Sequence, residues 1–382
     1  MHNNRYLILL IVFVAGVAAP LNQFKVPPMM QQLVEHFDMS IEVSGWLMSL
    51  FALVGMLFAL PSGHIIGRIG MKPSGTIALL ALLAGSVMGG TSTSLDMLIF
   101  SRIIEGIGLC LISVTGPAAI SAWFPPERRG AAMGVWATWV PIGTIIMFIA
   151  APAFGVWQNA WIFTSVYTLV ALAAFLVFFH MPGGFTVKYK TDGKVCRWSY
   201  SNKSIWLLAA VFMIYNIVIV SVKTYAPIFL EEELGLSLLK ASMFTALIML
   251  FSLASAPLCG WFSDLLKSRK IILISGLVMV CFVMLFLFTS GVTAFPFLLI
   301  ILGITGGIVP TATFSSVSEI MKEPHLTGKG MSVIALGQNA GMFCGPVLFS
   351  FLAGHYSWQT AGIIMIPLLL CALMASFMID VR

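Results

Sequence analysis

The chain consists of long apolar runs separated by short, charged connections. Breaking the sequence at its charge and Gly/Pro clusters leaves runs of about 20 residues or more, the length that an α-helix needs to cross a bilayer. Only 9% of the 382 residues are charged, against about 25% in an average soluble domain, and a soluble fold could not bury so much apolar surface. We predict an all-α membrane protein with twelve transmembrane helices, at 6–30, 45–66, 74–92, 96–122, 131–153, 161–181, 205–230, 238–262, 271–290, 295–319, 330–354 and 359–379.

The basic residues predict the orientation of these spans. Twelve spans put both termini on one side, and the connections on that side hold 16 of the 20 lysines and arginines. The opposite connections hold only Lys240. Cytoplasmic loops are enriched in Lys and Arg, so we predict that both termini are cytoplasmic and that the membrane is a bacterial inner membrane. The same bias explains the net charge of +6 without a nucleic-acid partner.

The two halves of the chain resemble each other at a nearly constant offset. KVPPMM from Lys25 aligns with KTYAPI from Lys223, 198 residues later, and MGVWATWVPIG aligns with MSVIALGQNAG at the same offset. The loop GHIIGRIGMK aligns with GWFSDLLKSRK at an offset of 197. Such a repeat predicts two pseudo-symmetric six-helix bundles related by an axis along the membrane normal. Their predicted bounds are 1–182 and 205–382, joined by a basic cytoplasmic linker at 183–204.

These features resemble the major facilitator superfamily of secondary transporters over the whole chain. The family signature after the second span is G-x-x-x-D-[RK]-x-G-x-[RK]-[RK]. Each half keeps part of it and departs elsewhere, and the matching positions include Gly63, Arg68, Lys72, Asp264, Arg269 and Lys270. The fourth-span segment RIIEGIG and the loop FPPERRGAAMG are also similar to the family pattern. The resemblance implies two bundles that rock about a central substrate site.

The six residues kept from that signature are candidate parts of a cytoplasmic gate. Their basic side chains lie where short loops cross the predicted cytoplasmic face. There they can pair with acids or with helix C-termini in one state and release them in another. Asp264 is the best candidate acid. A role in setting the orientation alone would explain the same charges.

Glycines are frequent in four of the predicted spans, the fourth, fifth, tenth and eleventh, and include Gly106, Gly134 and Gly341. Small residues let the backbones of two membrane helices approach closely. We therefore expect these glycines to mark helix contacts.

Three basic residues fall inside the predicted spans: Lys25, Lys223 and Arg102. A charge at mid-membrane costs about 2.5–3.5 kcal/mol on insertion scales. The repeat would bring Lys25 and Lys223 to facing walls of one central cavity, with Arg102 at a comparable depth. Low-dielectric walls strengthen the attraction of such a group for an anion, so we predict that the three residues bind an anionic substrate. Snorkelling of either lysine to the headgroups is the alternative.

Polar and aromatic residues near these cations complete the predicted site. Amide and hydroxyl groups suit a small carboxylate or an inorganic oxyanion. The predicted members are Asn22, Gln23, Tyr215, Asn216, Tyr225, Trp139, Gln338 and Asn339.

Glu105 is the carboxylate that lies deep inside a predicted span, one turn from Arg102. A carboxyl group in a dry site with a switchable partner can exchange a proton during transport, so Glu105 is the candidate for proton coupling. A permanent Arg102–Glu105 pair explains the same spacing equally well. Exchange of one anion for another would need no proton carrier.

We therefore predict a monomeric secondary active transporter that moves a small mono- or dicarboxylate by alternating access, as proton symport or anion exchange. The alternative is proton-coupled multidrug efflux, which the 23 Met and 29 Phe would suit, although Lys25 and Lys223 would repel cationic drugs. The sequence contains no nucleophile–base set, nucleotide-binding loop or metal-ligand cluster, and its six cysteines form no C-x-x-C pair. We predict neither enzyme activity nor a cofactor or metal.

Overall fold

The computed structural model describes residues 4–58, 68–180, 202–266, 268–321 and 324–380. Within these ranges, 12 helices are long and apolar enough to cross a membrane. Each corresponds to one predicted span, which confirms the predicted fold class. They are Arg5–His36, Ile41–Phe58, Met71–Gly90, Leu95–Trp123, Ala131–Ala153, Trp157–Phe178, Lys203–Glu232, Leu238–Cys259, Arg269–Thr289, Phe295–Met321, Lys329–His355 and Trp358–Phe377.

Two of the spans in the first half are interrupted helices. The first span consists of α1 and α2, and the fifth consists largely of α7 and α8. The described helices of this half are α1 (Asn4–Phe24), α2 (Val26–His36), α3 (Ile41–Phe58), α5 (Met71–Gly90), α6 (Leu95–Trp123), α7 (Pro126–Ala137), α8 (Trp139–Ala153) and α9 (Trp157–Phe178). The second half contains α11 (Lys203–Glu232), α12 (Leu238–Leu266), α13 (Arg269–Phe286), η1 (Leu287–Thr289), α14 (Phe295–Met321), α15 (Pro324–His355) and α16 (Trp358–Phe377).

Short polar side chains cap the N-termini of several of these helices. Ser357 Oγ accepts a hydrogen bond from the Thr360 amide at 3.1 Å, and Asn202 Oδ1 accepts one from the Ser204 amide at 3.0 Å. Such caps satisfy amide groups that a helix leaves without intrahelical partners. Most of the predicted linker 183–204 lies outside the described residues. Helix α11 begins at Lys203, so the last two residues of the predicted linker are helical.

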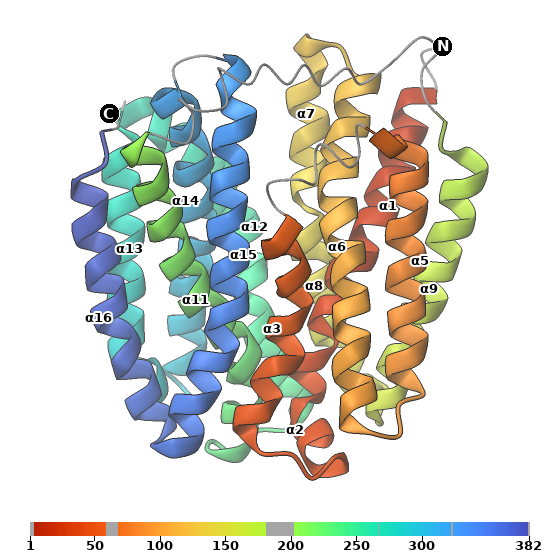
Figure 1. The fold of residues 1–382 in the computed structure, drawn as a ribbon. Coiled ribbons are helices and arrows are strands. Elements are labelled where there is room, and N and C mark those ends of the chain that lie inside the picture. The colour runs from red at the N-terminus through yellow and green to blue at the C-terminus, as the bar shows by residue number, and fades with distance from the viewer. Residues whose placement is uncertain (1–3, 59–67, 181–201, 267, 322–323, 381–382) are drawn as a thin grey trace.

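The helices form two bundles that stand side by side (Figure 1), with α1–α9 in the first bundle and α11–α16 in the second. Both chain ends lie at the same end of the molecule, which we call the terminal face, and α2 lies at the other end, the opposite face. The bundles meet where α3 packs against α15 and where α8 packs against α12. This boundary between the bundles is called the junction below.

Glycines allow α15 to pack closely on α11 within the second bundle. A Cβ atom added at Gly341 would lie 2.3 Å from the Met213 carbonyl oxygen of α11, and one at Gly337 would lie 2.4 Å from the Ala209 carbonyl oxygen. These values confirm the expected role for α15. The expectation is wrong for Gly134, where a Cβ atom would meet nothing within 4 Å.

Candidate substrate-binding site

The first span breaks at the predicted lysine. α1 ends at Phe24 and α2 begins at Val26, so Lys25 is the corner residue. The two residues that follow Val26, Pro27 and Pro28, have no N–H to donate to the carbonyls four residues earlier in the chain. The end of α1 therefore needs other hydrogen-bond donors for its carbonyl oxygens.

Arg102 of α6 donates to two carbonyl oxygens at the end of α1, and one of them, that of Gln23, lies four residues before Pro27. Its Nη1 donates to the Asn22 carbonyl oxygen at 2.9 Å and its Nη2 to the Gln23 carbonyl oxygen at 3.3 Å. Its Nε donates to the Leu47 carbonyl oxygen of α3 at 2.9 Å. The guanidinium carbon also lies 4.6 Å from the centre of the Phe51 ring. Arg102, which is completely buried, thus holds α6 against the broken end of α1 and against α3.

Glu105 joins Arg102 to Lys25. Its Oε1 lies 2.7 Å from Lys25 Nζ, and its Oε2 accepts a hydrogen bond from Arg102 Nη1. All three side chains are completely buried. The predicted Arg102–Glu105 pair is therefore present, and Lys25 extends it into a cluster of two cations and one carboxylate.

The Lys25 ammonium is surrounded by the first bundle. Its other hydrogen-bond acceptors come from three helices, and its Nζ lies 4.7 Å from the centre of the Trp161 ring. These acceptors are Asn22 Oδ1 at 2.9 Å, Ser86 Oγ at 3.0 Å and Thr164 Oγ1 at 3.3 Å. The ammonium is therefore fixed by polar partners at depth and does not extend toward the headgroups.

Lys223 has different surroundings, although it is the repeat partner of Lys25. It lies within the continuous helix α11, is 8% exposed, and its Nζ lies 5.1 Å from the centre of the Phe24 ring of α1. The part of the chain that the structure describes gives it neither an ion pair nor a hydrogen bond. Lys223 is thus a nearly buried cation that faces the other bundle without a counter-ion among those residues.

The remaining predicted site residues divide into two groups. Asn22 and Gln23 belong to the Lys25 cluster, since Asn22 Oδ1 accepts from Lys25 and the backbone carbonyl of Gln23 accepts from Arg102. The others lie outside that cluster, on α8, α11 and α15: Trp139, Tyr215, Asn216, Tyr225, Gln338 and Asn339.

Several members of the second group already use their polar atoms inside the protein. Asn216 Nδ2 donates to the Phe212 carbonyl at 2.7 Å, and Asn339 Nδ2 donates to the Ala335 carbonyl at 2.8 Å. Tyr225 bonds across the junction, with its hydroxyl 3.3 Å from Ser44 Oγ of α3. Trp139 stacks on Trp136 at a centroid distance of 5.0 Å, and Gln338 is half-buried.

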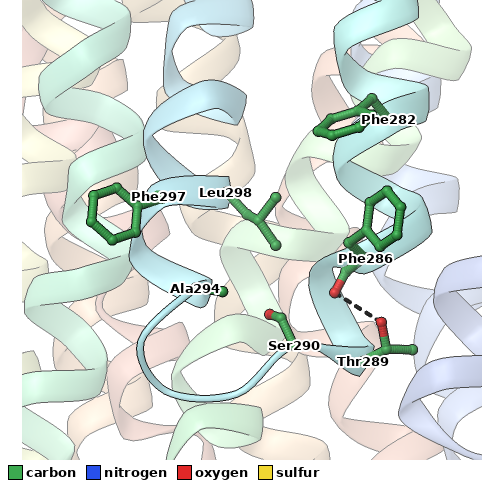
Figure 2. A pocket seen from close by; sticks show the side chains of 7 residues that line it. All are labelled: Phe282, Phe286, Thr289, Ser290, Ala294, Phe297 and Leu298. Carbon is green, nitrogen blue, oxygen red and sulfur yellow. Dashed lines mark hydrogen bonds between the residues drawn. The ribbon is translucent and has the colours of Figure 1, made fainter.

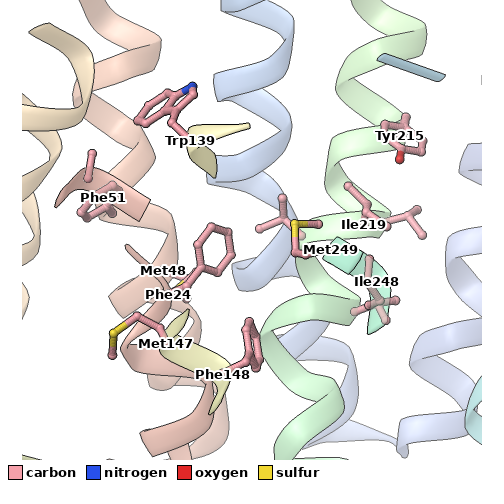
Figure 3. Packing of buried hydrophobic residues seen from close by; sticks show 14 of the residues in the cluster. Phe24, Met48, Phe51, Trp139, Met147, Phe148, Tyr215, Ile219, Ile248 and Met249 are labelled. Carbon is pink, nitrogen blue, oxygen red and sulfur yellow. The ribbon is translucent and has the colours of Figure 1, made fainter. Parts of the chain in front are cut away.

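Buried apolar side chains of both bundles pack at the junction (Figure 3). The Lys223 ammonium lies against the ring of Phe24. The centroids of the Phe24 ring and the Phe148 ring of α8 are 6.4 Å apart. Helices of both bundles contribute buried side chains to this region. They include Phe24, Met48, Phe51, Met147, Phe148, Ile219, Ile248 and Met249.

Two of the predicted gate residues, Lys72 and Lys270, lie near the start of α5 and of α13 on the terminal face. Lys72 Nζ donates to the Leu176 carbonyl of α9 at 3.0 Å, and Lys270 Nζ donates to the Phe377 carbonyl of α16 at 2.7 Å. Both carbonyls are in the last turn of a helix, where a cation is favourable. These contacts stay within one bundle each.

The structure describes some of the other predicted gate residues but not all of them. Arg269 pairs with Glu319 of α14 at 2.9 Å and also donates to the Ser315 carbonyl. Arg68 is exposed. Gly63 and the side chain of Asp264 lie outside the described residues, so the predicted acid partner is not described and the gate role stays a prediction.

A groove between α13 and α14 is a further hollow (Figure 2). Its volume is about 490 Å³, and it is lined by Phe282, Phe286, Thr289, Ser290, Ala294, Phe297 and Leu298. Phe282 and Phe297 are 50% and 68% exposed on the outer surface of the bundle. The lining carries no charged residue, so this groove does not match an anion site.

The family model described as Major Facilitator Superfamily matches residues 12–325 and 207–382 of the chain. The chain belongs to the major facilitator superfamily. It is therefore an integral membrane protein and a secondary transporter of a small molecule, and its family is one of transporters, not enzymes.

Two distant relatives of this facilitator cover nearly its whole length. It is 23% identical to a hexuronate transporter of Bacillus subtilis, over 90% of this chain and 87% of the relative. It is also 23% identical to a D-galactonate transporter of Escherichia coli O6:H1, over 94% and 91%. A bacterial homologue of the human lysosomal transporter Spinster, solved in an inward-facing and unoccupied conformation, matches it with a TM-score of 0.86 at 15% identity, over 99% of this chain and 98% of that one. This last likeness establishes the fold of the facilitator.

Proposed function

We propose that this transporter moves a small organic anion whose carboxylate binds Lys223. The observation that carries the proposal is a nearly buried ammonium group at the junction without a counter-ion in the described ranges. A buried charge without a partner is costly in a membrane protein and marks a functional position. The distant relatives named for hexuronate and D-galactonate support the charge of the substrate, because both compounds are carboxylates at neutral pH.

The junction supports alternating access as the mechanism. On the opposite face, His355 Nδ1 of α15 lies 3.7 Å from Glu42 Oε1 of α3, and Ser350 Oγ donates to the Glu42 carbonyl at 3.2 Å. Separation of the bundles at this face would break these contacts and open a path to the Lys223 region. We propose that the terminal face, with its basic residues, is the cytoplasmic side of a bacterial inner membrane.

The coupling mode belongs to the same proposal, as proton symport or anion exchange. Glu105 is the proposed proton carrier for symport, since its carboxylate holds both Lys25 and Arg102 and its protonation would weaken both contacts. With Glu105→Gln, loss of ionophore-sensitive accumulation together with intact exchange would support proton symport. Accumulation that a proton ionophore does not affect in the wild type would support anion exchange.

Counterflow in proteoliposomes tests the substrate proposal. Labelled carboxylates, including D-galactonate and D-glucuronate, are offered to the wild type, Lys223→Ala, Lys25→Ala and a control, Lys240→Ala, whose side chain is exposed. Loss of the partner of a buried charge costs about 2–5 kcal/mol, so Lys223→Ala should reduce saturable anion counterflow by more than about tenfold. Wild-type counterflow in Lys223→Ala, or transport of cationic dyes alone, would contradict the proposal.

A further inference from the structure

The cations of the spans differ in how many of their hydrogen-bond donors are free. Lys25 has three N–H donors and four oxygen acceptors within 3.3 Å, one of them a carboxylate. Arg102 donates to three backbone carbonyls and to Glu105. A substrate carboxylate would have to displace these partners. Lys223 has no such partner among the described residues, and it therefore offers the free positive charge.

The hydroxyl groups of α11 next to Lys223 are not free to bind a substrate. The neighbouring hydroxyls of α11 bond back to their own helix, with Ser221 Oγ 2.6 Å from the Ile217 carbonyl and Thr224 Oγ1 2.8 Å from the Val220 carbonyl. Across the junction, Phe24 and Phe148 present rings (Figure 3). Ile219, one turn before Lys223, is also buried.

An apolar wall selects against a substrate with many hydroxyl groups. A buried polar group without a hydrogen-bond partner costs about 1–3 kcal/mol, and a sugar acid carries several hydroxyls. A second carboxylate would meet the same apolar side chains without a second free cation. A hydrocarbon or aromatic body would instead contact Phe24, Phe148 and Met249 favourably.

We infer that the substrate is a monovalent carboxylate with an apolar body, an aliphatic or aromatic monocarboxylate. Lys223 sets the limit of one negative charge, and the apolar side chains of the junction exclude polyhydroxylated acids. This inference rests on the proposed function, because it assumes that Lys223 binds the carboxylate. It separates this chain from its distant relatives that are named for sugar acids.

Ligand-induced thermal stabilisation of the purified full-length protein tests the inference without a contribution from membrane permeation of the free acid. The probes are sodium benzoate, butyrate, succinate and D-galactonate. Benzoate or butyrate should stabilise the wild type at concentrations at least about tenfold lower than succinate and D-galactonate, and Lys223→Ala should lose this response. Lys223→Arg, which keeps the charge, should retain the order of the four anions.

The possible results separate the two proposals. A stronger, Lys223-dependent response to D-galactonate or succinate would overturn the inference and leave the proposed anion transport standing. Equal responses of the wild type and Lys223→Ala to all four anions would overturn both.

A second variant tests the apolar wall itself. Met249→Gln places an amide in the junction, whereas Met243→Gln changes the same residue type on the same helix at a position that is 49% exposed. Met249→Gln should shift the ratio of D-galactonate to benzoate affinity toward D-galactonate by severalfold, and Met243→Gln should leave it unchanged. The ratio is measured within one preparation, so reduced folding yield does not affect it. An unchanged ratio in Met249→Gln would contradict the inference.

Discussion

The buried cluster of the first bundle depends on one carboxylate. Glu105 contacts both Lys25 and Arg102, and all three side chains are completely buried. An ammonium and a guanidinium in a low-dielectric region are tolerable only when they are paired and hydrogen-bonded. Glu105 therefore has a structural role in this cluster, whichever coupling mode the transporter uses.

Glu105→Gln should destabilise the protein strongly. The change removes the counter-charge and leaves two buried cations with neutral partners, for which the expected cost is about 3–5 kcal/mol. The midpoint of thermal unfolding in detergent measures the effect. Glu35→Gln is the control, because Glu35 is exposed and its carboxylate accepts a hydrogen bond from Gln31 instead of holding a buried cation. Equal midpoints for the two variants would show that the cluster does not need its carboxylate.

Arg102→Lys should lower the stability of the protein, although the substitution keeps the charge. A lysine has one nitrogen and cannot reach the Asn22, Gln23 and Leu47 carbonyls together, as the planar guanidinium does. Each buried carbonyl left without a donor costs about 1–3 kcal/mol. A lowered unfolding midpoint relative to the wild type is expected, and an unchanged one would mean that water or another donor satisfies the end of α1.

At the scale of elements, α15 packs closely on α11 through a row of glycines. Gly337, Gly341 and Gly345 are spaced four residues apart, and a Cβ atom at any of them would come within 2.5 Å of an α11 carbonyl oxygen. The row thus lies on one face of α15. A side chain on this face would push the two helices apart.

Gly341→Ala should therefore lower the stability of the second bundle. The Cβ atom would lie 2.3 Å from backbone of α11, which cannot move as freely as a side chain. Overpacking of this kind costs about 1–3 kcal/mol. Gly134→Ala is the control, because its Cβ atom would meet nothing within 4 Å and alanine favours a helix over glycine. The prediction fails if both variants keep the wild-type unfolding midpoint in detergent.

At the scale of the whole molecule, the two bundles touch through specific contacts on the opposite face. The Glu42 carboxylate of α3 approaches His355 of α15, and the Tyr225 hydroxyl of α11 lies 3.3 Å from Ser44 Oγ of α3. These contacts join elements of the first and second halves of the chain. Alternating access requires that they break during each transport cycle.

A covalent link at this face should therefore stop transport. Glu42 and His355 are both partly exposed, so Glu42→Cys together with His355→Cys can be joined by a short thiol-reactive cross-linker. Counterflow should fall to the level of protein-free vesicles after cross-linking. The single-cysteine variants, treated with the same reagent, control for reaction at the native cysteines. Full counterflow in a fully cross-linked protein would show that this face does not open.

The sequence predicted the fold well because hydropathy and charge act locally along the chain. Every predicted span has a counterpart among the described helices, and the interruption at Lys25 coincides with Pro27 and Pro28. The fifth span breaks at Thr138, close to Pro141, which has no N–H to donate to the carbonyl of Ala137 at the end of α7.

The candidate site was less predictable. Lys25, Arg102 and Glu105 were all selected from the sequence, but Ser86 and Thr164 were not, because a single hydroxyl in an apolar span carries no signal of its partner. Apolar spans also have little periodicity, so the sequence does not fix which face of each helix meets its neighbour.

The sequence by itself determined the spans, the charge bias between the two faces, the repeat and the presence of buried charges, because these are properties of residue type and order. Only the tertiary structure decided that Glu105 contacts Lys25, 80 residues away, while Lys223 faces Phe24 across the junction. The repeat makes the two lysines equivalent in sequence. Their partners come from other helices, and so packing alone makes one a paired structural charge and the other a free one.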